Sequence, residues 1–396
     1  MTNNNDKKVL NVPPSTDKGN AIRNVPPLRF PEFSGEWKEE QLDSIATLSK
    51  GVGISKEQLS EVGEPCILYG ELYTKYKSEI IKQIESKTDI DCSKLKRSKA
   101  NDVIIPCSGE TAVDIATARC VPFDNILFGG DLNVISLHKY DGAFMSYQLN
   151  GKRKYDIARV AQGVSIVHLY GEHLKAIKTY NPTLPEQQKI AKLLSLLDDR
   201  IDTQNKIIEK LQSLIKGIAQ HCIKESTSGN TYVKLGDICQ ITTGKLDANA
   251  QVDNGIYPFF TCAEQPFKID SFAFDTEALL ISGNGANLGY INYYKGKFNA
   301  YQRTYVLDLF SENIQYIKWA LKVLLPKRIA IEKSSSNTPY IVLSTLTDLR
   351  LPIPCKSKQS FIANLMQSLE RKLSNQIAQY DSYNYLKQYL LRQMFI

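Results

Sequence analysis

Apolar residues recur at alternating steps of four and three residues in two long stretches of the chain. In the first stretch the repeating positions are Ile190, Leu194, Leu197, Ile201, Gln204, Ile208, Leu211 and Ile215. In the second stretch they are Ile362, Met366, Leu369, Leu373, Gln376, Tyr380, Tyr383 and Leu390. This spacing puts the side chains on one narrow stripe of a helix, which a long helix buries against another helix as a coiled coil. The pattern predicts long helices over residues 184–225 and 353–396.

The second stretch repeats the first at a constant distance along the chain, since 362 − 190 = 172 and 376 − 204 = 172. The segments that precede the two stretches also echo each other. The echoing pairs are Gln41–Ile45 with Lys234–Ile238, Val103–Gly109 with Ala278–Gly283, and Ser165–Leu169 with Tyr340–Leu343. The sequence is therefore interpreted as a duplicated unit of one globular head followed by one helix, in which the paired helices hold two heads apart.

This interpretation divides the chain into five parts. Residues 1–27 are expected to form a disordered leader, because they include a run rich in Asn, Lys and Asp and lack the apolar stretch of a signal peptide. Residues 28–183 and 226–352 are expected to be two α+β heads. The two long helices follow them, over 184–225 and 353–396.

Local patterns predict further elements around the first helix. A short amphipathic helix is expected after Trp37, and a Lys-rich helix is expected over Tyr73–Ile84. Strands are expected over Asp102–Cys107, Asn133–Leu137 and Val164–Leu169. Thr183 and Glu186 have the spacing of a capping box at the start of the long helix. The polar run Ser226–Asn230 is expected to be a linker after it.

Composition sets broad limits on the kind of protein. A chain of 396 residues is long enough for two or three domains with their own cores. No apolar stretch is long enough to span a membrane. The eight cysteines contain no C-x-x-C pair, which indicates reduced, structural cysteines and a cytoplasmic location. The formal charge of +7 permits a nucleic-acid partner but does not require one.

Three blocks of sequence carry a resemblance to a known family. They are Leu28–Trp37 (LRFPEFSGEW), Leu235–Ile238 (LGDI), and Leu184–Ala191 (LPEQQKIA) with the dipeptides Leu197-Asp198 and Ile201-Asp202. With them the chain closely resembles the specificity subunit of type I restriction-modification enzymes after residue 27. One departure is that the second helix opens with Ile353–Gln359 (IPCKSKQ), a degraded form of the Pro-Glu-Gln-Gln start.

The resemblance implies a fold, partners and a division of labour. Each head would be a target-recognition domain that reads one half of a split site in double-stranded DNA. The helices would form an antiparallel coiled coil that fixes the gap and offers a docking surface. Two modification subunits would bind S-adenosylmethionine and methylate adenine, and two restriction subunits would use ATP and magnesium. The chain itself would bind no cofactor and no metal.

Catalytic motifs are weak in this sequence. Asn181–Leu184 faintly suggests the Asn-Pro-Pro-aromatic loop of amino-methyltransferases but lacks the second proline and the aromatic residue. Gly283–Gly289 is rich in glycine but has no Lys-Ser/Thr after it, so a phosphate-binding loop is not expected. The four histidines form no evident relay. The chain is therefore expected to be non-catalytic.

Groups suited to DNA binding are more evident. In the first head they are Lys94, Lys96, Arg97, Lys99, Lys152, Arg153 and Lys154; in the second head they are Asn284, Asn287, Gln302, Arg303, Lys327 and Arg328. Cations neutralise phosphates, whereas Asn, Gln and Arg also pair with base edges in the major groove. The other interpretation of each cluster is an ordinary solvated charged surface.

The two glutamines of the stripe, Gln204 and Gln376, also allow two interpretations. A polar residue in an apolar seam can fix the register of a coiled coil at a cost in stability. Alternatively, each amide is tolerated because it reaches solvent. Both residues lie near the middle of their helices, so an antiparallel pairing would bring them together.

Two other functions compete with DNA recognition. One is a coiled-coil scaffold whose two heads bind proteins, and the other is a self-contained restriction-methylation enzyme, against which the missing motifs argue. For DNA recognition the helix length is adequate. A helix of about 37 residues spans about 55 Å, more than the roughly 34 Å of one DNA turn.

Overall fold

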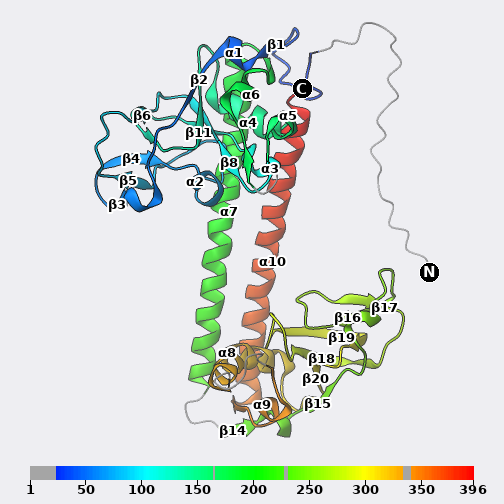
Figure 1. Cartoon of the computed structure of the whole chain (residues 1–396). Helices are drawn as coiled ribbons and strands as arrows, with labels where there is room; N and C mark the ends of the chain where they lie inside the picture. Colours follow the sequence, from blue (N-terminus) through cyan, green and yellow to red (C-terminus); the bar gives the residue numbers. More distant parts are fainter. Residues whose placement is uncertain (1–23, 164–165, 227–230, 333–339) are drawn as a thin grey trace, which may run out of the picture. The chain divides into compact units, whose positions relative to one another are not determined.

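The structure is a computed structural model that describes residues 24–163, 166–226, 231–332 and 340–396. The chain divides into two compact units, one of Met1–Thr203 with Asp381–Ile396 and one of Gln204–Tyr380. Each unit contains a mixed α+β head and a segment of both long helices, α7 (Leu184–Glu225) and α10 (Lys356–Gln393). The helices are therefore shared by the units, although the sequence interpretation treated them as separate parts. Figure 1 shows the elements of each unit.

The first head consists of short strands and helices. They are β1 (Lys38–Gln41), α1 (Leu42–Ile45), β2 (Ala46–Lys50), η1 (Lys56–Gln58), β3 (Leu59–Ser60), β4 (Glu64–Ile67), α2 (Glu71–Thr74), β5 (Ser86–Thr88), β6 (Lys96–Arg97), β7 (Asp102–Pro106), β8 (Ser108–Gly109), α3 (Ala112–Ile115), β9 (Arg119–Val121), β10 (Leu127–Phe128), β11 (Leu132–Leu137), α4 (Gly142–Asn150), α5 (Lys154–Val160), β12 (Val167–His168), α6 (Gly171–Lys175) and β13 (Lys178–Asn181).

Strand β7 is the centre of the first head. All five of its residues are buried, as expected for a continuous apolar run covered on both faces. It pairs antiparallel with β11 and β9 in a sheet of order β2-β11-β7-β9. A second sheet, of order β3-β5-β4-β10-β6, forms a lobe beside it. The strand pair β1–β13 closes the head and leads directly into α7.

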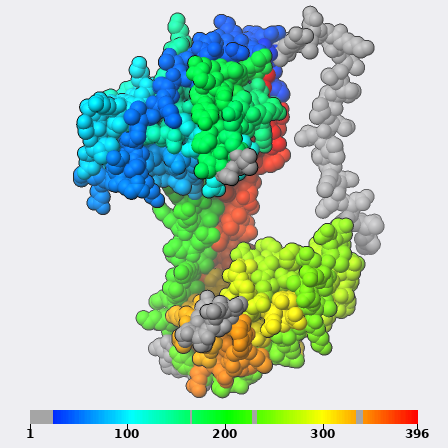
Figure 2. Space-filling view, in the orientation of Figure 1, coloured from blue at the N-terminus to red at the C-terminus, as the bar shows by residue number. Residues whose placement is uncertain are grey.

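The C-terminal end of α10 is part of the first unit. Phe395 and Met394 are buried with Trp37, Phe144 and Leu194 in one apolar cluster. The Phe395 ring lies 5.2 Å from the ring of Phe144, measured between centroids. Figure 2 shows this red end of the chain lying against the blue and green surface of the first head.

The second head follows the same order of construction. Its elements are β14 (Thr231–Lys234), η2 (Leu235–Asp237), β15 (Gln240–Thr243), η3 (Ala248–Ala250), β16 (Tyr257–Phe260), β17 (Phe267–Ile269), β18 (Phe274–Ser282), β19 (Ile291–Ala300), β20 (Thr304–Asp308), α8 (Ile314–Glu332), α9 (Leu343–Thr347) and β21 (Arg350–Ile353).

Sheet topology demonstrates the internal duplication. The order β15-β20-β18-β19 of the second head corresponds to β2-β11-β7-β9 of the first, and β14–β21 corresponds to β1–β13. The long strand β19 replaces both β9 and β10, because its end pairs parallel with β16 as β10 pairs with β4. The two heads therefore share a framework and differ in the lobes attached to it.

The predicted pairing of the two long helices is confirmed in each unit. The stripe positions are all buried or partly buried. In the second unit, Gln204 Nε2 donates to the Gln376 side chain at 2.9 Å and to its backbone carbonyl at 3.0 Å. The Lys358 ammonium reaches the carbonyl of Glu225 at 3.0 Å, so the helix segments run antiparallel. The expected contact between the two glutamines is present.

A buried glutamine joins each head to its helix. In the first unit, Gln187 Nε2 donates to the carbonyl of Pro182 at 2.8 Å, and Gln187 Oε1 accepts the backbone N–H of Asp141 at 2.9 Å. In the second unit, Gln359 makes the same two bonds, to Pro354 at 2.9 Å and to Asn313 at 3.0 Å. These residues are related by the helix offset, since 359 − 187 = 172. The degraded start of the second helix has kept this glutamine.

Several local predictions need correction. The strands expected at 102–107 and 133–137 are present as β7 and β11. The Lys-rich helix over 73–84 is wrong, because only α2 is helical there and Ile80–Ile81 pairs as extended chain with Cys120. The short helix after Trp37 is the single turn α1.

Corrections also apply near the long helices. The Tyr340–Leu343 segment, which the sequence matched to a β-rich stretch, leads into helix α9. Helix α10 begins at Lys356, because Arg350–Ile353 forms β21. The Glu186 carboxylate accepts bonds from Arg29 at 2.7 and 2.8 Å and not the reciprocal bond of a capping box. Most of the predicted leader, and residues 164–165 and 227–230, lie outside the described residues.

Replacement of the second glutamine tests this attachment. Gln359→Ala leaves the Pro354 carbonyl and the Asn313 N–H buried without their partners, so unfolding free energy should fall by about 1–3 kcal/mol. Chemical denaturation of the purified chain measures the loss. The control is Ser360→Ala, an exposed neighbour on the same helix. Equal stability of the two variants would contradict the role given to Gln359.

Candidate nucleic-acid interface

In the second head, two of the predicted DNA-binding groups come together beyond the end of β18. The Gly283 N–H donates to the carbonyl of Arg303 at 2.8 Å, which joins the loop after β18 to the turn between β19 and β20. A Cβ atom at Gly283 would lie 2.4 Å from that oxygen, so glycine is required for this approach. The contact brings Asn284 and Asn287 to the same edge as Gln302 and Arg303, the last two of which are exposed.

A third segment completes this edge. The N–H of Ile341 donates to the carbonyl of Gly283 at 2.8 Å, and the Tyr305 hydroxyl donates to the carbonyl of Ile341 at 2.8 Å. Tyr340 and Val342 on either side are 58% and 42% exposed. We call Gly283–Asn287, Gln302–Arg303 and Tyr340–Val342 together the loop edge of the second head.

The first head builds the same edge from different side chains. The N–H of Cys107 donates to the carbonyl of Asp131 at 2.7 Å, and the N–H of Leu169 donates to the carbonyl of Cys107 at 2.8 Å. Two of these positions match the second head at the helix offset, since 303 − 131 = 172 and 341 − 169 = 172. The loop edge of the first head comprises Ser108–Thr111, Gly130–Asp131 and His168–Tyr170.

Aromatic and polar side chains occupy the edge of the first head. The rings of His168 and Tyr170 are stacked, with centroids 6.2 Å apart, and Tyr170 is 53% exposed. The Tyr73 hydroxyl donates to the carbonyl of Ser108 at 3.1 Å and so supports the loop. Sequence reasoning did not select these residues. The echo of 165–169 at 340–343 was a usable signal, but it was interpreted as a strand.

The first predicted cationic cluster lies in the lobe of the first head. Lys96 and Arg97 form β6, and Lys94 and Lys99 are exposed beside it. The Arg97 guanidinium is engaged with Glu64, at 2.9 Å for one of its two bonds. The three lysines thus remain surface cations, whereas Arg97 already has an acidic partner.

Most of the second predicted cluster, Lys152 to Lys154, makes contacts inside the first unit. Arg153 donates to the carbonyl of Ile396 at 3.1 Å, pairs with Asp156 at 3.2 Å and lies over the ring of Tyr180. Burial lowers the pKa of the Lys154 ammonium, which is partly enclosed. Of the three adjacent cations, Lys152 is exposed, whereas Arg153 and Lys154 are partly buried. Surface phosphate contacts from Arg153 and Lys154 do not fit this placement.

Helix α8 carries the remaining predicted pair. Lys327 is exposed, whereas the Arg328 guanidinium pairs with Glu332 at 2.7 Å one turn later. These two residues therefore supply one unpaired cation at most to a ligand at this helix.

Residues considered for catalysis have structural partners. Asn181 is buried in β13, where its amide donates to Thr179 at 3.0 Å and to Glu40 at 3.1 Å. In the described part of the chain, no group of three or more His, Cys, Asp and Glu side chains could hold a metal ion. Nor is any helix among the described residues both long and apolar enough to cross a membrane.

The different uses of neighbouring cations can be tested by thermal unfolding. Arg153→Met removes the bond to Ile396 and the ion pair with Asp156. The free energy of unfolding should fall by about 1–2 kcal/mol, which lowers the melting temperature by several degrees. Lys152→Met is the matched control and should leave the melting temperature unchanged. Calorimetry of both variants decides, and equal melting temperatures would contradict a structural role for Arg153.

Comparisons with known proteins agree with this architecture. The sequence is 44% identical over 137 residues to the type I restriction enzyme EcoDI specificity subunit of Escherichia coli. It is 25% identical over 256 residues to the MjaIX specificity subunit of Methanocaldococcus jannaschii. The matches cover 35% and 54% of this chain but 30% and 59% of those proteins, so they span less than two thirds of each relative.

Solved structures show the same fold. The crystal structure of the type I restriction-modification S subunit from M. genitalium superposes with a TM-score of 0.67 at 20% identity, covering 94% of this chain and 99% of that one. A chain from a study of complex assembly and conformational transition in the type I R-M system gives 0.55 at 16% identity, covering 91% and 97%.

The family match extends over both copies of the duplicated unit. Residues 34–213 and 227–380 each match the type I restriction modification DNA specificity domain. Each matched range contains one head with its loop edge and the buried glutamine, Gln187 or Gln359, that joins the head to its helix. The chain therefore belongs to the family of type I restriction modification DNA specificity domains.

Proposed function

We propose that this chain is the DNA-specificity subunit of a type I restriction-modification complex, in which each head reads one half of a bipartite target. The observation that carries the proposal is the loop edge, which is built twice on one framework. Corresponding backbone bonds support both edges, but the side chains differ: the polar and aromatic ones are Asn, Gln, Arg and Tyr in one, and Ser, Thr, Glu, Asp, His and Tyr in the other. Two similar surfaces with different chemistry suit a target whose halves differ in sequence.

The chemistry of each edge fits base recognition. In the second head, Arg303 can pair with guanine, and Asn284 and Gln302 can pair with adenine in the major groove. The Asn287 amide already donates to the carbonyl of Cys262 at 3.0 Å. In the first head, the Ser108 hydroxyl offers a donor and an acceptor, and Tyr170 offers an exposed ring. The Thr111 hydroxyl already bonds to Asp114 as the cap of α3. The exposed cations Lys94, Lys99, Lys152 and Lys327 are suited to phosphates, which position a protein on DNA without reading its sequence.

Partners would supply the catalytic steps. The similar proteins from E. coli and M. jannaschii are named as specificity subunits, and one similar structure concerns complex assembly of a type I R-M system. We propose that this chain assembles with two modification subunits and two restriction subunits in the cytoplasm. The modification subunits would bring S-adenosylmethionine, and the restriction subunits ATP and magnesium. This chain would bind DNA and its partners without a cofactor of its own.

Exchange of one head tests the proposed function. Residues Leu28–Pro182 are replaced by the matching head of a relative, and the complex with modification subunits is expressed in a host whose methylated adenines are then mapped. One half of the methylated site should change and the other half should stay. The unmodified chain is the control. If both halves changed, or if neither did, the heads would not be reading DNA independently, and binding of proteins by the heads would become the better explanation.

A single side chain of the loop edge should affect one half-site only. Arg303→Ala should weaken discrimination at one base pair of the second head's half-site by about 1–3 kcal/mol, because a bidentate contact with a base would be lost. Methylation of a library of sites measures this preference. Arg350→Ala, at an exposed arginine of the same head, is the control. A uniform loss of methylation over all sequences would instead place Arg303 on a phosphate.

A further inference from the structure

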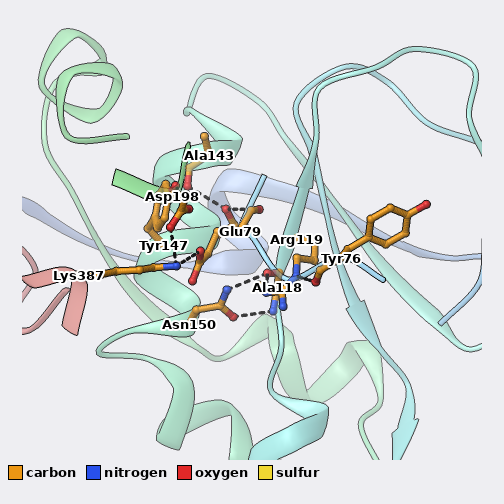
Figure 3. Close-up of polar contacts among 10 residues, drawn as sticks. Tyr76, Glu79, Ala118, Arg119, Ala143, Tyr147, Asn150, Asp198 and Lys387 are labelled. Atoms are coloured by element: carbon orange, nitrogen blue, oxygen red, sulfur yellow. Dashed lines mark hydrogen bonds and ion pairs between the residues drawn. The ribbon is translucent and has the colours of Figure 1, made fainter. Parts of the chain in front are cut away.

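Lys387 of α10 joins three separate segments inside the first unit. Its ammonium lies 2.6 Å from Glu79 Oε2 in the head and 2.7 Å from Asp198 Oδ1 on α7. The three side chains are 13%, 8% and 4% exposed, so the ion pairs are shielded from water. Figure 3 shows Lys387 entering from one helix toward the two carboxylates.

Neighbouring groups hold the Asp198 carboxylate and the backbone of Glu79 in place. The Tyr147 hydroxyl donates to Asp198 Oδ2 at 2.6 Å. The carbonyl of Glu79 accepts the N–H of Cys120 at 2.8 Å and the Ser146 hydroxyl at 3.1 Å, which fixes the backbone that carries the acid. Each partner of Lys387 is therefore itself oriented by other hydrogen bonds.

The charges of this network are balanced. Arg119 is buried beside it and donates to the carbonyls of Tyr76 at 2.8 Å and Ala118 at 3.0 Å. Two cations thus accompany two carboxylates. Burial alone would lower the pKa of Lys387, but Glu79 and Asp198 outweigh burial and raise it, so the ammonium stays charged.

The surroundings explain why charge placement matters here. The rest of the contact is an apolar cluster that includes Leu197, Leu390 and Phe395. Apolar contacts are non-directional and tolerate small rotations or shifts of a helix. An ammonium held between two fixed carboxylates tolerates neither, because any shift leaves a buried charge without its partner. The network therefore selects one orientation of the head on the helices.

The second unit keeps the acid but takes its cations from elsewhere. Glu370 corresponds to Asp198, since 370 − 198 = 172. It accepts bonds from Lys318 at 2.7 Å and Lys322 at 3.2 Å, both on helix α8 of its own head. In the first unit, Lys387 therefore links the head to both long helices. In the second unit, the corresponding ion pairs link the head to α10 only.

We propose that Lys387 is a positioning residue that fixes the first head on both long helices and thereby sets the allowed spacing of the two DNA half-sites. The inference rests on the proposed function. If it holds, the ammonium acts on the spacer between the half-sites and leaves the sequence read by each loop edge unchanged.

The test uses the complex of the full chain with its modification subunits and a DNA library with both half-sites and spacers of varied length. Wild type should methylate one spacer length. Lys387→Met should spread methylation to spacers one base pair shorter and longer, with both half-sites unchanged. Lys387→Arg should restore most of the single preference, because it keeps the charge. Lys192→Met, at an exposed lysine of α7, is the matched control and should behave as wild type.

A second measurement does not depend on DNA. Amide hydrogen exchange in Asp381–Ile396 should be about tenfold faster in Lys387→Met than in wild type, a change of about 1.4 kcal/mol in local opening. If wild type methylates no bipartite site, the proposed function fails, and exchange still shows whether Lys387 holds the helix end. The inference about Lys387 fails separately: wild type then methylates its bipartite site, but Lys387→Met keeps the same single spacer.

Two results would overturn the positioning role. The first is a Lys387→Met complex with a lower melting temperature and one unchanged spacer, which describes a stabilising residue only. The second result comes from another variant, which is used if Lys387→Met does not fold. The double variant Asp198→Asn and Lys387→Met then removes one charge of each sign and leaves Glu79 beside Arg119, so the buried charges stay balanced. Strict preference for one spacer in the folded double variant would refute the proposal, and a broadened preference would support it.

Discussion

The attachment of each head to its helix depends on one buried amide, that of Gln187 in the first unit and Gln359 in the second. An amide both donates and accepts, so it satisfies a proline carbonyl at the end of a strand and an N–H at the start of a head helix. These two backbone groups belong to different elements, and both would lack partners without the amide. The head, the strand that leaves it and the long helix therefore form one rigid junction. Within each unit, the loop edge takes its position on the helix segments from this junction.

The framework of each head leaves its recognition side chains free to vary. The loop edges are held by backbone bonds, from Cys107 to Asp131 in one head and from Gly283 to Arg303 in the other. A backbone bond constrains the path of the chain and makes little demand on the side chain, except where close approach requires glycine. Two copies of one fold can therefore carry an Asp at one site and an Arg at the corresponding site.

The parts of the structure that follow from local periodicity could be predicted from the sequence. The stripe from Ile190 to Ile215 records burial along a single helix, and the offset of 172 residues revealed the duplication. The helix expected over Tyr73–Ile84 failed because a distant strand residue, Cys120, pairs with that segment. Arg153 resembled a surface cation because its partner, Ile396, is 243 residues away. Contacts of that range leave no local signal. His168 and Tyr170 were missed for another reason, because the repeat that contains His168 was interpreted as a strand.

The completion of the first unit by Asp381–Ile396 has a consequence for synthesis on the ribosome. The first head leaves the ribosome before the second, but the place beside Trp37 and Phe144 that Phe395 fills stays vacant until Phe395 has emerged. All of the second unit, Gln204–Tyr380, is made in that interval. The head translated first is thus the last to finish folding. Throughout that delay its apolar cluster is open to chaperones, or to another nascent copy whose C-terminal segment could occupy the vacant place.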